Sequence, residues 1–224
     1  SVLKRKMSIN YKNRIFGRSL GRSKKKINLN NYFQSINTYK FTKFDLKNDY
    51  ILDIGSGYGE TSIYLAKNYL SKKIITCDKY INGNIKLLKK INDERIENIN
   101  IYHGHVYDIL DTNLENQYLS LVWIFFPDPW PKKKHFKRRL LSIYFLNKIY
   151  HFLKKDAQII IATDSISYSR SILKNIYETK NLYSWTNQYS IYSSIKDYYD
   201  IETKFYKKAI FYGRMPSLFI LKKI

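Results

Sequence analysis

From residue 49 onward, short apolar runs alternate with segments of helical spacing, and this order constrains the fold more than any other feature of the sequence. Five runs read as strands, namely DYILDI, KKIITCD, NINIYHG, LSLVWIFF and AQIIIATD. Helices are expected between and after them, at 61–70, 84–96, 106–114, 136–155 and 165–179. Strands that alternate with helices predict a parallel, doubly wound α/β sheet.

The run LSLVWIFF has no polar alternation, so both of its faces are expected to be covered by helices in the middle of the sheet. The segments KFYKKAI and SLFILKK are expected to add a final hairpin after the five strands. The fold class is therefore predicted as α/β, with a doubly wound, mostly parallel seven-stranded sheet.

Charge and periodicity divide the chain into two parts. Residues 1–46 have little hydrophobic periodicity and read as a basic N-terminal arm, whereas residues 47–224 form the predicted α/β domain. The formal net charge of +22 indicates a polyanionic partner such as nucleic acid or an anionic membrane surface. The alternative is that an AT-rich genome, which over-uses Lys, Asn, Ile and Tyr, accounts for part of the lysine excess.

Several classes of protein are disfavoured. No run of about 18 apolar residues occurs and the N-terminal SVLKRKMSIN lacks the apolar segment of a signal peptide, so we expect a soluble protein. A single cysteine, Cys77, excludes an internal disulfide, and the four histidines show no zinc-ligand spacing. We expect no metal and no membrane partner, whereas the oligomeric state stays open, with a monomer among the options.

A glycine turn, GSGYG, follows the first strand and is flanked by two carboxylates. Gly55, Gly57 and Gly59 have GxGxG spacing, which differs from the GxGxxG of dinucleotide sites. Asp53 precedes the turn, where a carboxylate would repel a pyrophosphate and attract an ammonium group. Asp78 ends the second strand, where an acidic residue commonly hydrogen-bonds the hydroxyls of a ribose. Together they favour S-adenosylmethionine over NAD. The alternatives are a turn that needs glycine for steric reasons and an Asp78 that only caps its strand.

The segment FFPDPWPKKK holds Asp128 between two prolines. Three prolines in five residues forbid a helix or central strand and leave Asp128 little backbone freedom. Trp130 and the block Lys132–Lys134 suit a nucleobase and its phosphates. A simple turn after the strand is the alternative.

The chain resembles the bacterial tRNA (guanine-N7)-methyltransferases, a class I methyltransferase family with a Rossmann-like fold. The resemblance covers nearly the whole chain and rests on FGRSLGRSKKK, LDIGSGYGE, FFPDPWPKKKHFKRR, ATD at 162–164, TKFY and the GR that follows. It implies methyl transfer from S-adenosylmethionine to N7 of a guanosine in the tRNA variable loop, at position 46. The AT-rich bias suits a bacterial cytoplasm and an organelle equally.

The resemblance also implies roles for single residues. Asp53, the turn glycines and Asp78 would bind S-adenosylmethionine, with His105 or the nearby Asp108 close to the adenine. Asp128 would lie at the donor and be the catalytic residue. The residues implied to contact tRNA are Lys132, Asp164, Thr203, Lys204, Phe205 and Tyr206.

Other roles are open for some of these residues. Asp164 would equally suit a helix N-cap, and Lys204 a solvated strand position. Arg138 and Arg139 are expected either on the exposed face of a helix or at RNA phosphates.

The chemistry of N7 bears on the role of Asp128. This nitrogen already offers a lone pair, so no general base is required and catalysis rests on positioning and electrostatics. Three rivals remain. They are methylation of an exocyclic amine, usually marked by Asn/Asp-Pro-Pro-aromatic, an NAD-dependent oxidoreductase, and an RNA-binding protein that keeps the fold without activity.

Overall fold

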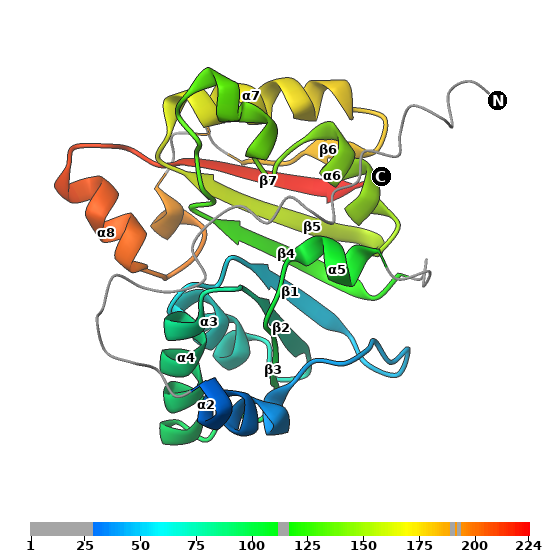
Figure 1. The fold of residues 1–224 in the computed structure, drawn as a ribbon. Helices are drawn as coiled ribbons and strands as arrows, with labels where there is room; N and C mark the ends of the chain where they lie inside the picture. The colour runs from blue at the N-terminus through cyan, green and yellow to red at the C-terminus, as the bar shows by residue number, and fades with distance from the viewer. Residues whose placement is uncertain (1–28, 112–116, 189–190, 192–193) are drawn as a thin grey trace.

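A computed structural model describes residues 29–111, 117–188, 191 and 194–224. Within these residues, seven strands form one sheet in the order β3-β2-β1-β4-β5-β7-β6 (Figure 1). Their bounds are β1 Tyr50–Ile54, β2 Lys73–Cys77, β3 Ile99–Tyr102, β4 Leu119–Phe125, β5 Leu153–Thr163, β6 Tyr183–Trp185 and β7 Ser217–Lys223. Strands β1 to β5 are parallel, and β7 runs antiparallel to β5 and β6. The predicted mostly parallel seven-stranded sheet is confirmed.

Helices cover both faces of the sheet and make two apolar cores. One core joins the sheet to α5 Val106–Leu110, α6 Ile143–Tyr150 and α7 Ile166–Glu178. The other joins it to α2 Leu29–Ile36, α3 Glu60–Asn68 and α4 Ile81–Asp93. Along β4, Val122 and Ile124 face the first core whereas Trp123 faces the second, and all three are fully buried. The apolar run LSLVWIFF is therefore central because both of its faces are covered.

The predictions for two elements, a helix and a hairpin, were wrong. The helix expected at 136–155 is shorter, because the chain is extended at Arg139 and α6 begins after Ser142, whose hydroxyl accepts from the backbone N–H of Phe145 at 3.2 Å. The short 3-10 helix η3 Lys133–Arg138 precedes it, and Lys154 and Lys155 lie on β5.

The expected final hairpin is wrong in its first strand. The segment KFYKKAI forms the helix α8 Lys204–Phe211, and the antiparallel partner of β7 is the earlier β6. Thr203 begins α8, since its hydroxyl accepts from the N–H of Tyr206 at 3.1 Å. Figure 1 shows α8 beyond the carboxyl ends of β4 and β5.

Part of the predicted basic arm packs against the sheet. Tyr32, Ile36, Phe41 and Phe44 are buried, and Lys40 pairs with Ile101 of β3. The basic residues on which the arm was predicted, Arg14, Arg18, Arg22 and Lys24 to Lys26, lie outside the described residues. The division of the chain at residue 46 stays a prediction.

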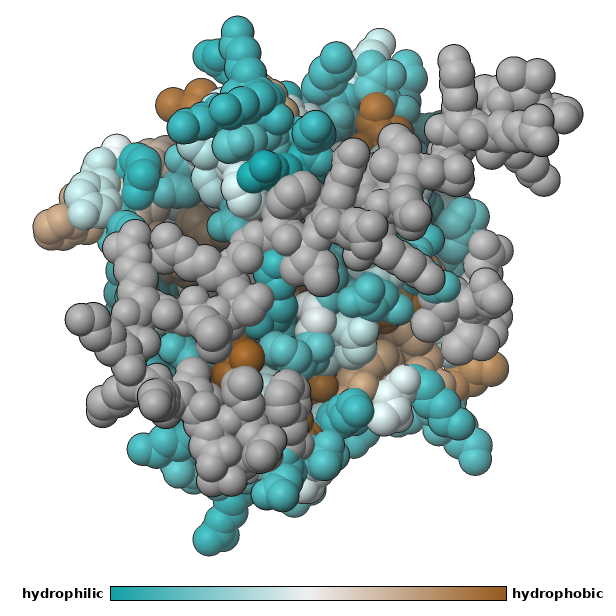
Figure 2. Space-filling view, in the orientation of Figure 1, coloured by the Kyte–Doolittle hydropathy of each residue, from teal (hydrophilic) through white to brown (hydrophobic). Residues whose placement is uncertain are grey.

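In the described ranges, no helix has the length and apolar character needed to cross a membrane. Hydrophilic side chains cover much of the face in Figure 2, which accords with the charged composition.

Candidate functional site

The glycine turn connects β1 to α3 at the carboxyl edge of the sheet. All three of its glycines have positive φ, between 54° and 77°. A Cβ on Gly59 would lie 2.5 Å from Leu87 Cδ1, and a Cβ on Gly83 would lie 1.9 Å from the carbonyl oxygen of Gly57. Helix α4 thus packs directly against the turn. Around Gly55, by contrast, an added Cβ meets no atom within 4 Å, so the turn has open space on that side.

Asp78 ties the turn to the end of β2. Its Oδ2 accepts from the backbone N–H of Gly57 at 2.8 Å, and its Oδ1 accepts from that of Tyr80 at 2.9 Å. Asp78 therefore does cap the end of its strand, as the alternative reading expected. This role is compatible with ligand binding, because each carboxylate oxygen has a second lone pair that can accept a hydrogen bond from a ligand. The ribose contact of Asp78 stays a prediction.

Asp53 is buried, with 1% of its surface exposed. Its Oδ2 accepts from the hydroxyls of Thr61 and Ser62 at 2.6 Å each, which anchors the first turn of α3 to β1. Burial raises the pKa of Asp53 to about 6, against the effect of both hydroxyl hydrogen bonds. Its contact with a donor ammonium group stays a prediction.

A polar cluster beneath Asp78 was missed by sequence reasoning. The amide nitrogen of the fully buried Asn84 lies 3.1 Å from the carbonyl oxygen of Asp78, 3.1 Å from the hydroxyl of Tyr32 and 3.2 Å from Nδ1 of His103. Tyr32 belongs to α2, so this cluster links the part of the chain before β1 to the Asp78 loop. No sequence pattern signals such a long-range contact.

His105 and Asp108 both lie just after β3 and form one capping box. Nδ1 of His105 accepts from the N–H of Tyr107 at 3.3 Å, and Oδ2 of Asp108 accepts from the N–H of His105 at 3.1 Å. Burial lowers the pKa of His105, with opposition from Asp108. Since both side chains cap α5, the choice of adenine contact between them stays open.

The Asp128 loop follows β4, and two residues with unusual backbone geometry flank the aspartate. Phe126 has φ of 51° and Trp130 has φ of 42°, both in the left-handed region that non-glycine residues rarely adopt. Such strain concentrates at functional sites, where the surrounding structure holds it in place. Asp128 itself is exposed.

Lys79 links Asp128 electrostatically to the donor side of the site. Burial lowers the pKa of Lys79, and the carboxylates of Asp128 and Asp78 both oppose that shift. Its ammonium nitrogen is buried and has no hydrogen-bond partner. The charge of Lys79 therefore interacts with a carboxylate of the loop after β4 and with one of the loop after β2, which the sequence did not suggest.

Arg139 holds the Asp128 loop against α7. Its Nε donates to the carbonyl oxygen of Pro129 at 2.8 Å, and its two terminal nitrogens donate to the carbonyl oxygen of Ser167 at 3.1 Å and to the Ser167 hydroxyl at 2.8 Å. The guanidinium also lies 3.7 Å from the ring centroid of Phe136. Arg139 is buried, so neither expected role, the exposed helix face or the phosphate contact, fits it.

The other basic residues of this segment are more exposed to solvent than Arg139. Lys132 is exposed and immediately precedes η3. The guanidinium of Arg138 lies 5.0 Å from the ring centroid of Trp130. Lys132 stays a predicted tRNA contact.

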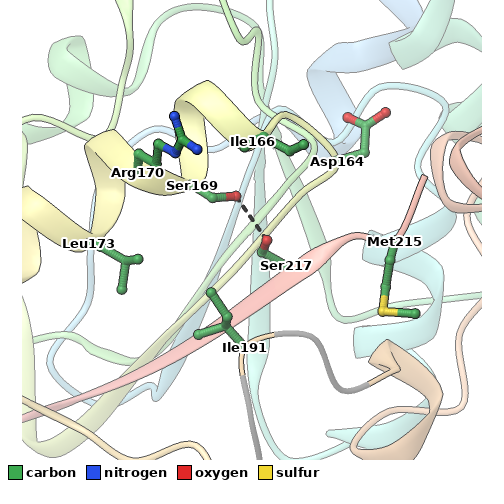
Figure 3. A pocket seen from close by; sticks show the side chains of 8 residues that line it. All are labelled: Asp164, Ile166, Ser169, Arg170, Leu173, Ile191, Met215 and Ser217. Carbon is green, nitrogen blue, oxygen red and sulfur yellow. Dashed lines mark hydrogen bonds between the residues drawn. The ribbon is translucent and has the colours of Figure 1, made fainter.

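Asp164 directly follows β5 and lines a small hollow of about 90 Å³ (Figure 3). Its Oδ2 lies 3.1 Å from Nε of Arg214, which follows α8. The helix N-cap expected as an alternative for Asp164 is Ser165, whose hydroxyl accepts from the N–H of Tyr168 at 3.4 Å. Asp164 is therefore not the N-cap, and its carboxylate lies at the carboxyl edge of the sheet. Its contact with tRNA stays a prediction.

The predicted substrate residues at 203–206 are brought to the same edge. The backbone N–H of Lys204 donates to Oε2 of Glu60 at 2.8 Å, next to the glycine turn. The ring of Phe205 stacks on that of Phe126, with centroids 6.2 Å apart. Tyr206 points inward, with its hydroxyl 3.2 Å from that of Ser194. Lys204 is the first residue of a helix, so the strand position expected as an alternative is wrong.

Among the residues that the structure describes, no group of three His, Cys, Asp or Glu side chains has a metal-binding arrangement. The site consists of a glycine turn, carboxylates, one lysine with a buried ammonium nitrogen and a strained loop.

Comparisons with known proteins agree with this geometry. A family model described as a putative methyltransferase matches residues 47–215. The tRNA (guanine-N(7)-)-methyltransferase of Buchnera aphidicola subsp. Schizaphis graminum is 34% identical over 175 residues, which cover 77% of this chain and 72% of the relative. The enzyme of the same name from Neorickettsia sennetsu is 31% identical over 134 residues, which cover 60% of this chain and 61% of the relative.

Two solved structures share the fold. A putative rRNA-methylase from Clostridium thermocellum is 12% identical, with a TM-score of 0.54 over 90% of this chain and 98% of that one. A putative methyltransferase from Streptococcus mutans in complex with SAH is 14% identical, with a TM-score of 0.52 over 89% of this chain and 99% of that one.

Proposed function

The chain belongs to the tRNA (guanine-N7)-methyltransferase family, and we propose that it transfers a methyl group from S-adenosylmethionine to N7 of a guanosine in the variable loop of tRNA, at position 46. The observation that carries this proposal is the strained Asp128 loop, which lies after β4 at the same carboxyl edge of the sheet as the Asp78 loop after β2. That edge is where doubly wound folds bind their ligands.

The residues present fit S-adenosylmethionine. The open space around Gly55 admits a ligand close to the backbone, and the buried hydroxyl oxygen of Ser56, within the turn, has no hydrogen-bond partner. Asp78 would hold the ribose, Asp53 would attract the ammonium group, and His105 or Asp108 would lie near the adenine. When bound, the donor supplies an electrophilic methyl group on a sulfonium.

Asp128 would act by electrostatics. Guanine N7 needs no deprotonation before it attacks the methyl group, so a general base has no proton to remove. Methylation leaves a positive charge on the guanine ring, and a carboxylate held close to the ring stabilises that charge as it grows. The two prolines and Arg139 would keep the carboxylate in place, so little reorganisation is needed during the reaction.

The tRNA would approach over the loops at the same edge. Lys132 is exposed beside the Asp128 loop and suits a phosphate. Asp164 and the segment of Thr203, Lys204, Phe205 and Tyr206 complete the proposed substrate site. Phe205, which stacks on Phe126, would connect that segment to the Asp128 loop.

One experiment tests the activity. The protein is incubated with methyl-labelled S-adenosylmethionine and unmodified tRNA, and the nucleosides of the digested product are separated. We expect labelled N7-methylguanosine. Label in another nucleoside, such as one methylated on an exocyclic amine, would assign a different methyl acceptor, and donor binding without any label in tRNA would indicate an RNA-binding protein.

A further inference from the structure

Helix α8 exposes large apolar side chains to an unusual degree. Of its eight residues only Ala209 is fully buried. Phe205 is 52% exposed, Phe211 82%, and Tyr212, directly after the helix, 62%. Figure 2 shows brown, hydrophobic side chains at the position that α8 occupies in Figure 1. Exposed aromatic groups of this size in a soluble domain mark a binding surface.

The aromatic residues share one side of the helix with lysines. At 100° per residue, five side chains fall within an arc of roughly 120°, and the Phe205 end of this arc lies about 40° from the buried Ala209. We call them the α8 face, and they are Lys204, Phe205, Lys208, Phe211 and Tyr212. The guanidinium of Arg214, 5.4 Å from the ring centroid of Tyr212, adds another positive charge.

The α8 face is continuous with the candidate site. Phe205 stacks on Phe126 at the start of the Asp128 loop, and the ammonium group of Lys204 lies 5.1 Å from the ring centroid of Tyr58 in the glycine turn. From there, the helix carries Phe211 and Tyr212 outward, away from both loops. A ligand that reaches Asp128 along this side therefore passes over the face.

We propose that the α8 face is a stacking surface for unpaired tRNA bases next to the target guanosine. The inference rests on the proposed function and deepens it, because it adds Lys208, Phe211 and Tyr212 to the substrate surface. Aromatic rings stack with any base, and lysines between them hold the phosphates, as single-stranded nucleic acid requires. A second copy of this chain is a poor occupant, because two molecules of net charge +22 repel each other.

The test compares tRNA affinity among four proteins, namely wild type, the double variant Phe211→Ala/Tyr212→Ala, Lys208→Gln and the control Tyr177→Ala. Tyr177 is a matched control because it is 66% exposed and has Lys180 4.7 Å from its ring centroid. It lies at the far end of α7, which starts after β5 and so runs back to the opposite edge of the sheet. Donor affinity, measured by calorimetry, verifies that each variant is folded.

We expect the aromatic double variant to bind unmodified tRNA about tenfold or more weakly, with the same dependence on salt, since stacking releases no counterions. Lys208→Gln should instead lower the slope of log K against log salt by roughly 0.7–0.9. Tyr177→Ala should match the wild type. The KM for tRNA in the methylation assay should follow the affinities.

Wild-type tRNA affinity in the aromatic double variant would overturn the inference. So would a loss of binding to phosphatidylserine vesicles, or a loss of dimerisation, in that variant while its tRNA affinity is kept, since these results would assign the face to a membrane or to a second copy. If the wild type itself transfers no methyl group to tRNA, the proposed function fails. If it does and the double variant keeps its tRNA affinity, only this inference fails.

Discussion

Arg139 holds the Asp128 loop against α7 through three hydrogen bonds, which we call the Arg139 clamp. The variant Arg139→Lys tests whether this clamp controls catalysis. Lysine keeps the positive charge but loses the planar fork that reaches Pro129 and Ser167 together. A single ammonium nitrogen cannot take the places of three guanidinium nitrogens, so not all three hydrogen bonds can survive. The strained backbone of Phe126 and Trp130 then loses part of the surrounding contact that holds it, so the loop should relax.

The size of the effect follows from these contacts. A hydrogen bond from a charged donor contributes about 1.5–3 kcal/mol. Loss of the Pro129 contact alone should therefore destabilise the catalytic position of the loop by that amount. A barrier higher by 1.5–3 kcal/mol corresponds to a kcat lower by about 10- to 150-fold, which agrees with the roughly 100-fold cost of a 1 Å misplacement. Donor affinity should not change, because no described hydrogen bond joins Arg139 to the glycine turn or to Asp78.

Single-turnover kinetics at saturating tRNA, together with calorimetry for the donor, separates the two effects. Arg95→Lys is the matched control, since Arg95 is exposed in the connection between α4 and β3, at the opposite edge of the sheet. A wild-type kcat in Arg139→Lys would refute the clamp. A loss of donor affinity equal to the loss of kcat would refute it as well, because it would indicate general unfolding of the site.

Three further predictions concern the carboxylates. Asp78→Ala should weaken S-adenosylmethionine by about 1–3 kcal/mol in calorimetry, and unchanged affinity would remove Asp78 from the donor site. Because burial raises the pKa of Asp53 to about 6, its ionisation should lower folding stability as the pH rises through 6, whereas donor affinity should rise over the same range because the ammonium group favours the carboxylate. Asp53→Asn should abolish both pH dependences in thermal melts and titrations, and a persistent dependence would assign them to another group. Asp128→Asn should lower kcat by about 10²–10³ and retain measurable turnover, whereas complete loss in the Asn variant would indicate a general base.

The sheet could be predicted because its strands are apolar runs of ordinary length. The strand β4 has no polar alternation, and the structure places it between β1 and β5 with both faces covered. The ends of helices were harder to predict, because Lys154 and Lys155 suit the end of a helix and an exposed stretch of β5 equally well. The segment KFYKKAI was misread because its short apolar pattern does not separate a strand from a one-sided helix.

The candidate site was partly visible in the sequence. The glycine turn, Asp78 and the Asp128 loop each follow a strand, and parallel strands bring their carboxyl ends to one edge. The clamp by Arg139 was not visible, since it depends on a contact with α7 and an arginine beside lysines suits an exposed surface. The role of Gly83 was missed, because this glycine lies just before the helix expected at 84–96, whereas α4 begins at Ile81. A glycine inside a helix often marks close packing, and here the carbonyl of Gly57 occupies the space that a side chain would need.

The most direct test of the account maps the methylated atom and its position in one measurement. N7-methylguanosine is cationic, and its glycosidic bond breaks after borohydride reduction and aniline treatment. We predict that tRNA treated with the wild-type protein and S-adenosylmethionine is cut at one guanosine in the variable loop, and that tRNA treated with Asp128→Ala is cut far less. Methyl incorporation without scission would show that another atom accepts the methyl group, and equal scission with Asp128→Ala would remove the Asp128 loop from the chemistry.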